Sequence, residues 1–121
     1  MKDPKDLDLT KRIRKLSYEI YQLSMTFPKF ELYEIGSQLR RATDSILLQF
    51  SEGNGSIYPK TTIKFLDGAI CSGHEVRAIL DIILDRKYIT SDKHMELENE
   101  FKEIQFILIA LKNRQNQKNK K

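Results

Sequence analysis

The chain has 121 residues, of which 40% are hydrophobic and 31% charged, so it has the size and the apolar content of one domain with one core. Cys71 is the only cysteine, which excludes an internal disulfide and a zinc site built on several thiolates. No apolar run approaches the roughly 20 residues that cross a bilayer, and no apolar signal segment follows the first residues. We therefore expect a cytoplasmic protein.

The first part of the chain repeats apolar residues in steps of three and four, which predicts an amphipathic helix over about 8–25. The stripe consists of Leu9, Ile13, Leu16, Ile20, Leu23 and Phe27. Pro28 interrupts it, because its ring does not fit inside a helix. A second helix is expected over about 30–51, with the stripe Leu32, Ile35, Leu39, Ala42, Ile46 and Phe50. Glycine at Gly53 or Gly55 is expected to end this helix in the left-handed conformation.

A third helix is predicted over about 59–84, since Pro59 suits a first helical turn. Its stripe is Thr62, Leu66, Ala69, Gly73, Val76, Leu80 and Ile83. A second row gives this helix two faces to bury: Phe65, Ser72, Ile79 and Ile82. Four small residues of this helix are expected to let a neighbouring helix approach closely: Gly68, Ala69, Ser72 and Gly73.

A fourth helix is predicted over about 91–113, capped by Thr90 or Ser91 and followed by a basic disordered tail over about 114–121. Its stripe is Leu97, Phe101, Ile104, Leu108 and Leu111. Residues 104–111 are apolar on nearly all sides, so we expect one side of this helix to meet another subunit. Four helices with short connections predict a single all-α domain over 1–121. Its expected fold is an antiparallel up-down-up-down four-helix bundle.

Residues in the middle of the chain form a pattern at characteristic spacings. It includes Phe27-Pro28, Glu31, Tyr33, Gln38, Leu39, Arg40, Arg41, Ala42, Ser45, Ile46, Glu52, Gly53, Gly55, Phe65, Leu66, Ala69, Ser72 and Glu75. Over about 16–89, this pattern resembles the bacterial four-helix bundle family associated with 23S ribosomal RNA intervening sequences. More remotely it is similar to the accessory protein of diversity-generating retroelements, a basic pentamer that engages a reverse transcriptase and nucleic acid.

The resemblance implies a four-helix bundle, often a pentamer, from a family without an established enzyme activity. The chain departs from the family pattern around the second connection. Gln49-Phe50-Ser51 stands where the family commonly has Asn-Ile-Ala, and Ser56 stands where it commonly has an Arg. Early in the third helix, Thr61-Thr62 replaces Glu-Phe, and further along Cys71 replaces a Gly. These changes leave the expected fold intact, but they weaken the case for a shared ligand site in the loop.

The formal net charge of +4 is unevenly distributed. Five of the 21 Lys and Arg residues follow Leu111 without any acid, so residues 1–111 contain 16 basic and 17 acidic residues. The bundle topology places the start of the first helix and the end of the fourth at one pole, which becomes basic. Candidate phosphate-binding residues there are Lys11, Arg12, Arg14, Lys15, Lys60, Lys64, Lys112 and Arg114. The alternative is that these residues are an ordinary solvated face and tail.

Structural roles are expected for the residues of the family pattern. Arg40 or Arg41 should lie level with Glu75 and pair with it within or between subunits. The Glu52 carboxylate should lie close to the amides of Gly53 and Gly55.

No arrangement of residues predicts catalysis, a cofactor or a metal. A di-iron bundle needs Glu-x-x-His pairs, and the two histidines, His74 and His94, do not form them. The loop at 52–56 lacks the strand and the Lys-Ser/Thr ending of a phosphate-binding loop. Our leading hypothesis is a non-enzymatic homo-oligomer, with a pentamer first, that binds RNA, DNA or a partner protein. The alternative is a purely structural protein-interaction module.

Overall fold

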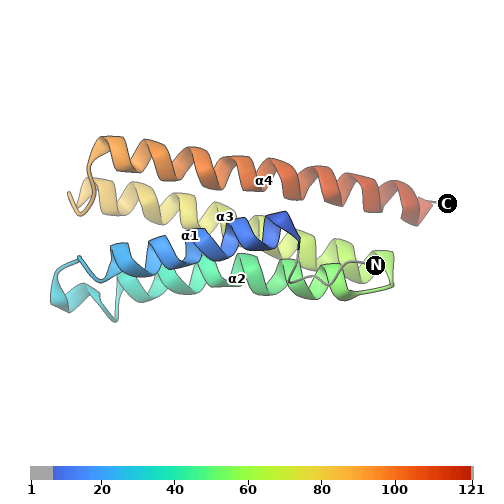
Figure 1. The fold of residues 1–121 in the computed structure, drawn as a ribbon, viewed down its shortest axis with the longest axis horizontal. Coiled ribbons are helices and arrows are strands. Elements are labelled where there is room, and N and C mark those ends of the chain that lie inside the picture. Colours follow the sequence, from blue (N-terminus) through green and yellow to red (C-terminus); the bar gives the residue numbers. More distant parts are fainter. Residues whose placement is uncertain (1–6, 121) are drawn as a thin grey trace.

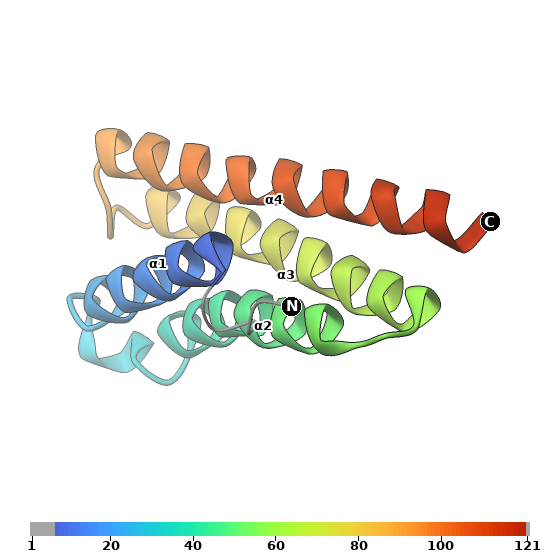
Figure 2. The same cartoon turned by 45° about the vertical axis from the view of Figure 1, so that its right-hand side comes forward.

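The computed structural model describes residues 7–120. It contains four α-helices and one short 3-10 helix, with the order α1 (Asp8–Ser24), η2 (Lys29–Glu31), α2 (Ile35–Gly55), α3 (Pro59–Asp85) and α4 (Ser91–Lys120). Consecutive α-helices run in opposite directions, as Figure 1 shows, so the expected up-down-up-down bundle is confirmed. The turned view in Figure 2 shows that α3 lies between α2 and α4.

The core is formed by the apolar stripes that the sequence predicts. Its fully buried members include Ile13 and Ile20 of α1, Leu39 of α2, Leu80 of α3 and Phe101 of α4. Burial of each such side chain stabilises the fold by about 1.5–3 kcal/mol relative to exposure. The alternation of steps of three and four therefore predicts the inner face of every helix.

Helix α1 is much shorter than α3 and α4 and does not cover their whole length. In Figure 1 the start of α1 lies part of the way along the bundle, while α2, α3 and α4 continue beyond it. The C-terminal end of α4 projects farthest. The start of α1 and the end of α4 are directed to the same side of the molecule, but the start of α1 lies well short of the end of α4 (Figure 1).

The second helix begins and ends later than predicted. The segment after Pro28 forms the 3-10 turn η2, and α2 starts at Ile35 instead of about 30. At the other end α2 passes through Glu52 and Gly53 and stops at Gly55, where 51 was expected. No glycine of residues 7–120 has a positive φ, so the expected left-handed glycine cap is wrong.

Close helix packing explains Gly53 instead. A Cβ at this position would lie 2.9 Å from Cβ of Phe65 and 3.4 Å from the carbonyl oxygen of Thr62, so only glycine fits between α2 and α3. The carbonyl oxygen of Gly53 accepts hydrogen bonds from the Thr62 hydroxyl at 3.1 Å and the Ser56 amide at 3.2 Å. These bonds satisfy a carbonyl at the helix end, which otherwise lacks a partner.

The two apolar rows of α3 are largely covered within the chain, because α3 packs against both α2 and α4; Ile82 remains 37% exposed. Gly73 faces α4, where a Cβ would lie 2.9 Å from Cγ of Gln105, and Gly68 faces Gln49 of α2. These contacts agree with the expected role of Gly68 and Gly73 in close helix approach. The two-sided character of α3 needs no second subunit to explain it.

The turn from α3 to α4 has well-formed caps. The amide of Tyr88 donates to the carbonyl of Ile83 at 2.8 Å and that of Lys87 to Leu84 at 2.9 Å, which is the Schellman pattern, with Lys87 at φ 63°. The Thr90 hydroxyl accepts from the amide of Lys93 at 3.1 Å, which confirms the predicted cap of α4.

The fourth helix does not end at 113. It continues to Lys120, so residues 114–120 are helical and the expected disordered tail is corrected for them; Lys121 lies outside the described residues. No Gly or Pro follows Gly73, and Lys, Arg and Gln are good helix formers, which favours this continuation.

Candidate nucleic-acid interface

An open groove of about 660 Å³ runs between α1 and α2. From α1 it is lined by residues at the helical spacings of three and four, which therefore share one face. These residues are Lys11, Arg14, Lys15, Ser17, Tyr18 and Tyr21. From α2 it is lined by Arg40, Asp44 and Leu47. The groove is thus a cationic surface with two aromatic rings.

The cations at the rim are available to a ligand. The side chains of Lys11, Arg14 and Lys15 are exposed and form no hydrogen bond or ion pair with residues 7–120. Asp44 is the one acid of the lining, and it accepts a 2.5 Å hydrogen bond from the hydroxyl of Ser17. With Arg40 at the inner side, the lining has four cations and one acid, so it attracts anions.

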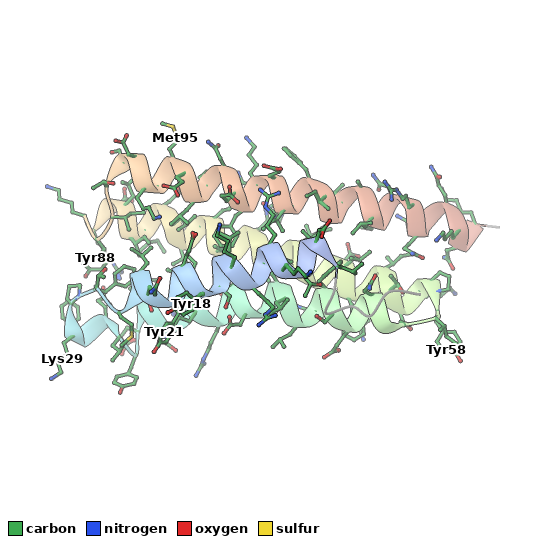
Figure 3. The ribbon with its side chains drawn as sticks, in the orientation of Figure 1. Tyr18, Tyr21, Lys29, Tyr58, Tyr88 and Met95 are labelled. Atoms are coloured by element: carbon green, nitrogen blue, oxygen red, sulfur yellow. The ribbon has the colours of Figure 1, made fainter. Side chains whose placement is uncertain are left out.

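Two tyrosines extend the cationic rim. Tyr18 is 61% exposed and Tyr21 51%, and their ring centroids lie 6.5 Å apart at a tilt of 31°. Figure 3 shows the two labelled side chains beside each other on the α1–α2 side of the molecule. Exposed aromatic rings next to cations are the combination on which single-stranded nucleic acids stack.

Arg12 does not belong to this groove, although it was predicted with the other basic residues. Its Nη1 donates to Oε1 of Glu103 at 2.9 Å and its Nη2 to Oε2 of Glu100 at 3.1 Å. The hydrogen bond that Arg12 donates to Glu103, with the one to Glu100, raises the pKa of Arg12 above its ordinary value. Arg12 therefore joins α1 to α4 and is neutralised by two acids.

The remaining predicted cations lie on other helices. Lys60 and Lys64 are exposed on the first turns of α3, and Arg114 is exposed near the end of α4. The ammonium group of Lys112 forms a 2.6 Å ion pair with Asp67 of α3, which reduces its availability to a phosphate. The eight predicted residues are thus divided among the groove, the α1–α4 contact and the α3–α4 side.

Three residues of the family pattern have internal roles. Arg40 donates to the hydroxyl of Ser24 at 3.0 Å and to the carbonyl oxygen of Leu32 at 2.9 Å, so it fixes the α1–α2 turn. The hydroxyl of Ser72 donates to that of Ser45 at 2.9 Å, which joins α3 to α2.

Other residues of the pattern face solvent: Gln38, Arg41, Glu52, Gly55 and Glu75. The expected ion pair of Arg40 or Arg41 with Glu75 is not formed within residues 7–120, because Arg40 is directed to the turn and Arg41 outward. The Glu52 carboxylate makes no hydrogen bond to the amides of Gly53 and Gly55, since α2 is still helical there.

The sequence interpretation missed the tyrosines as part of the basic surface. Tyr18 follows Arg14 by four residues and Lys11 by seven, which places all three on one helical face. That spacing was the available signal. The groove itself is formed by α1 together with α2, so the sequence of α1 alone does not predict it.

By fold and surface, the protein is an antiparallel four-helix bundle with a cationic, aromatic groove between its first two helices. A family model described as 23S rRNA-intervening sequence protein matches residues 5–110. The chain belongs to this family, as the resemblance of the sequence implied.

A solved structure of similar fold is a crystal structure of a protein of unknown function from the S23 ribosomal protein family of Bacteroides thetaiotaomicron. The TM-score is 0.76 at 21% sequence identity, over 87% of this chain and 95% of that one. This likeness shows the fold. No curated protein matches the chain significantly. None of the helices in residues 7–120 is long and apolar enough to span a membrane.

Proposed function

We propose that this protein is a non-enzymatic binding protein that engages single-stranded segments of nucleic acid, RNA in particular, in the groove between α1 and α2. The carrying observation is that Lys11, Arg14 and Lys15, which have no partner among residues 7–120, share one groove with Tyr18 and Tyr21. The cations would neutralise successive phosphates, while the rings would stack on bases.

Contacts of this kind carry little sequence information. Lys and Arg bind phosphate oxygens irrespective of the base, and stacking tolerates every base. We therefore expect weak sequence preference and a strong dependence on salt. On a single strand, log affinity should fall by about 0.7 per phosphate neutralised for each unit of log salt concentration.

The test is a salt titration of binding to a labelled single-stranded RNA, an RNA hairpin and duplex DNA. A triple variant, Lys11→Gln with Arg14→Gln and Lys15→Gln, should flatten the salt slope on single strands by about two. The matched control removes three exposed lysines elsewhere: Lys29→Gln, Lys87→Gln and Lys102→Gln. This control should retain the slope.

The tyrosines give a second readout. Tyr18→Leu and Tyr21→Leu should each weaken binding of single strands by about 1–3 kcal/mol without altering the salt slope. Absence of binding by the wild type at about 50 mM salt, where the phosphate contribution is strong, would contradict the proposal. Equal losses in the groove variant and the charge-matched control would contradict it too. The protein would then be a protein-interaction module without a nucleic-acid role.

We also propose that the chain self-associates through the outer face of α4, with a ring of five as the first expectation and a dimer next. Phe106 is 60% exposed there, and Ile109, three residues further along the helix, is 37% exposed. Sedimentation equilibrium should give a mass well above 14.2 kDa at micromolar concentration, and Phe106→Ser with Ile109→Ser should reduce it. Tyr33→Ser, at an exposed tyrosine outside this face, is the control. A wild-type mass near that of one chain would refute self-association.

A further inference from the structure

Three side chains with metal-binding atoms meet near the turn from α3 to α4. They are Asp81 of α3 and His94 and Glu98 of α4, and one ligand atom of each lies within 4.8 Å of the other two. Nε2 of His94 is 2.8 Å from Oδ1 of Asp81. The cluster lies on another pair of helices from the groove between α1 and α2.

The helical geometry explains how the three residues converge. His94 and Glu98 are four residues apart on α4, so both side chains project from one face. Antiparallel packing of α3 on α4 brings Asp81 opposite them, although it precedes His94 by 13 positions in the chain. Spacing in the sequence therefore gives no hint of the cluster.

Glu98 supplies an independent observation. Its Oε1 accepts a 2.7 Å hydrogen bond from Nε of Arg77, which fixes the carboxylate. Its Oε2 is buried and has no hydrogen-bond partner among residues 7–120. A buried carboxylate oxygen without a partner costs free energy, and a bound cation would compensate this oxygen.

The charges around the cluster favour a divalent cation. Asp81 and Glu98 contribute two negative charges, and Arg77 contributes one positive charge that opposes binding. Nη1 of Arg77 is itself engaged by Oε1 of Gln105 at 2.8 Å. The ligands and this arginine together carry a charge of −1 with a neutral His94. Asp81 is 70% exposed, which leaves a path from solvent.

We propose that Asp81, His94 and Glu98 bind a divalent first-row transition ion, Zn²⁺ first among them. One imidazole and two carboxylates are ligands that suit zinc, whereas calcium and magnesium prefer oxygen alone. Three protein ligands leave a coordination position for water. The bound ion would link α3 to α4 at the end where these helices are connected.

The test uses untagged, chelator-treated full-length protein. Calorimetric titration with ZnCl₂ should give one ion bound per chain, and Co²⁺ should show visible absorption bands of a protein-bound ion. Zinc should also raise the melting temperature of the protein. An excess of CaCl₂ or MgCl₂ should neither displace the zinc nor raise the melting temperature.

Variants assign the ligands. Each of three variants should weaken zinc binding by at least about tenfold: His94→Ala, Glu98→Gln and Asp81→Asn. Loss of a residue that only hydrogen-bonds to a metal ligand already costs about tenfold or more, and loss of the ligand itself should cost no less. Matched controls are His74→Ala, the only other histidine, and Glu96→Gln, an exposed acid on the same helix. They should bind zinc as the wild type does.

The proposal is overturned by two results. One is the absence of saturable binding at about 100 µM Zn²⁺, where a micromolar site would be filled. The other is unchanged affinity in the His94→Ala variant, which would place the ion elsewhere. Because Asp81 is exposed, Asp81→Asn keeps the test decisive if a variant at the more buried Glu98 fails to fold.

Discussion

The hydroxyl of Tyr88 donates a 2.7 Å hydrogen bond to Oε2 of Glu31, a carboxylate whose side chain is only 6% exposed. The same oxygen accepts from Nη1 of Arg86 at 2.9 Å, and the ring of Tyr88 packs on Phe27 with centroids 5.2 Å apart. Glu31 lies in the α1–α2 connection, and Tyr88 in the α3–α4 connection. This contact therefore holds the two connections at one end of the bundle together.

Tyr88→Phe should lower the urea midpoint of unfolding, because it keeps the ring and removes one of the two donors to a buried carboxylate. Tyr33→Phe, at a tyrosine that is 82% exposed, should leave the midpoint unchanged. The hydrogen bond to Glu31, with desolvation, raises the pKa of Tyr88 above its ordinary value of 10.0.

The raised pKa of Tyr88 gives this contact a pH dependence. Its stabilising contribution is complete below pH 10 and is lost as the pH rises through the pKa of the folded state. The difference in midpoint between wild type and Tyr88→Phe should therefore shrink above pH 10. A constant difference into strong alkali would show that the hydroxyl does not act through its proton.

Lys87→Gly should stabilise the protein by roughly 1 kcal/mol. Lys87 follows the cap of α3 at φ 63°, a conformation that costs side chains with a Cβ about 1–2 kcal/mol and glycine very little. Lys87→Ala retains the Cβ and should bring no such gain, which separates the backbone effect from the loss of charge. Thermal and urea unfolding of the wild type and the two variants measure the change in stability. Equal effects of the glycine and alanine substitutions would rule out the conformational explanation.

Gly73→Ala should destabilise the protein by about 1–3 kcal/mol, through overpacking. The new Cβ would lie 2.9 Å from Cγ of Gln105, which is buried and held at both ends of its amide. Its Nε2 donates to the carbonyl oxygen of Ile70 at 3.1 Å, and its Oε1 accepts from Arg77. Gln105 therefore cannot move aside without losing hydrogen bonds.

Gly55→Ala is the matched control for that substitution. A Cβ there meets nothing within 4 Å, and the residue is helical with a φ that any L-residue adopts. Its effect should lie between neutral and a gain of about 1 kcal/mol, from the lower conformational entropy of alanine. Equal losses at the two glycines would contradict the packing explanation of Gly73.

The period of apolar residues predicts which side of each helix is buried, and this explains why the fold is readable from sequence. Ile13, Leu39, Leu80 and Phe101 were all placed in the core by spacing alone. Helix ends were less predictable: Gly53 reads as a cap in sequence, yet close packing against Phe65 of the next helix decides its role. Local residue types do not contain that information.

In the candidate sites, too, features within one helix could be predicted from the sequence and contacts between helices could not. Lys11, Arg14 and Lys15 were grouped because they are near in sequence, and they line one groove. The ion pairs of Arg12 with Glu100 and Glu103 were not predicted, because these two acids lie far along the chain. The cluster of Asp81 with His94 was missed for the same reason. Contacts between helices depend on their relative rotation and register, which a single sequence does not specify.

The contact of Arg12 with α4 should weaken in acid. The hydrogen bond from Arg12, with its positive charge, lowers the pKa of Glu103 below its ordinary value of 4.5. The contribution of Glu103 to stability is therefore complete above pH 4.5 and is lost as the pH falls through its pKa in the folded state. Glu103→Gln should lower the urea midpoint at pH 7 and make no difference in strong acid. Because Glu103 is exposed, the effect at pH 7 should be small and should shrink with added salt.

Glu75→Gln, at an exposed acid of α3 with no ion pair among residues 7–120, is the control and should change the midpoint at neither pH. A Glu103→Gln difference that persists unchanged in acid would show that the glutamate acts by packing and not by its charge.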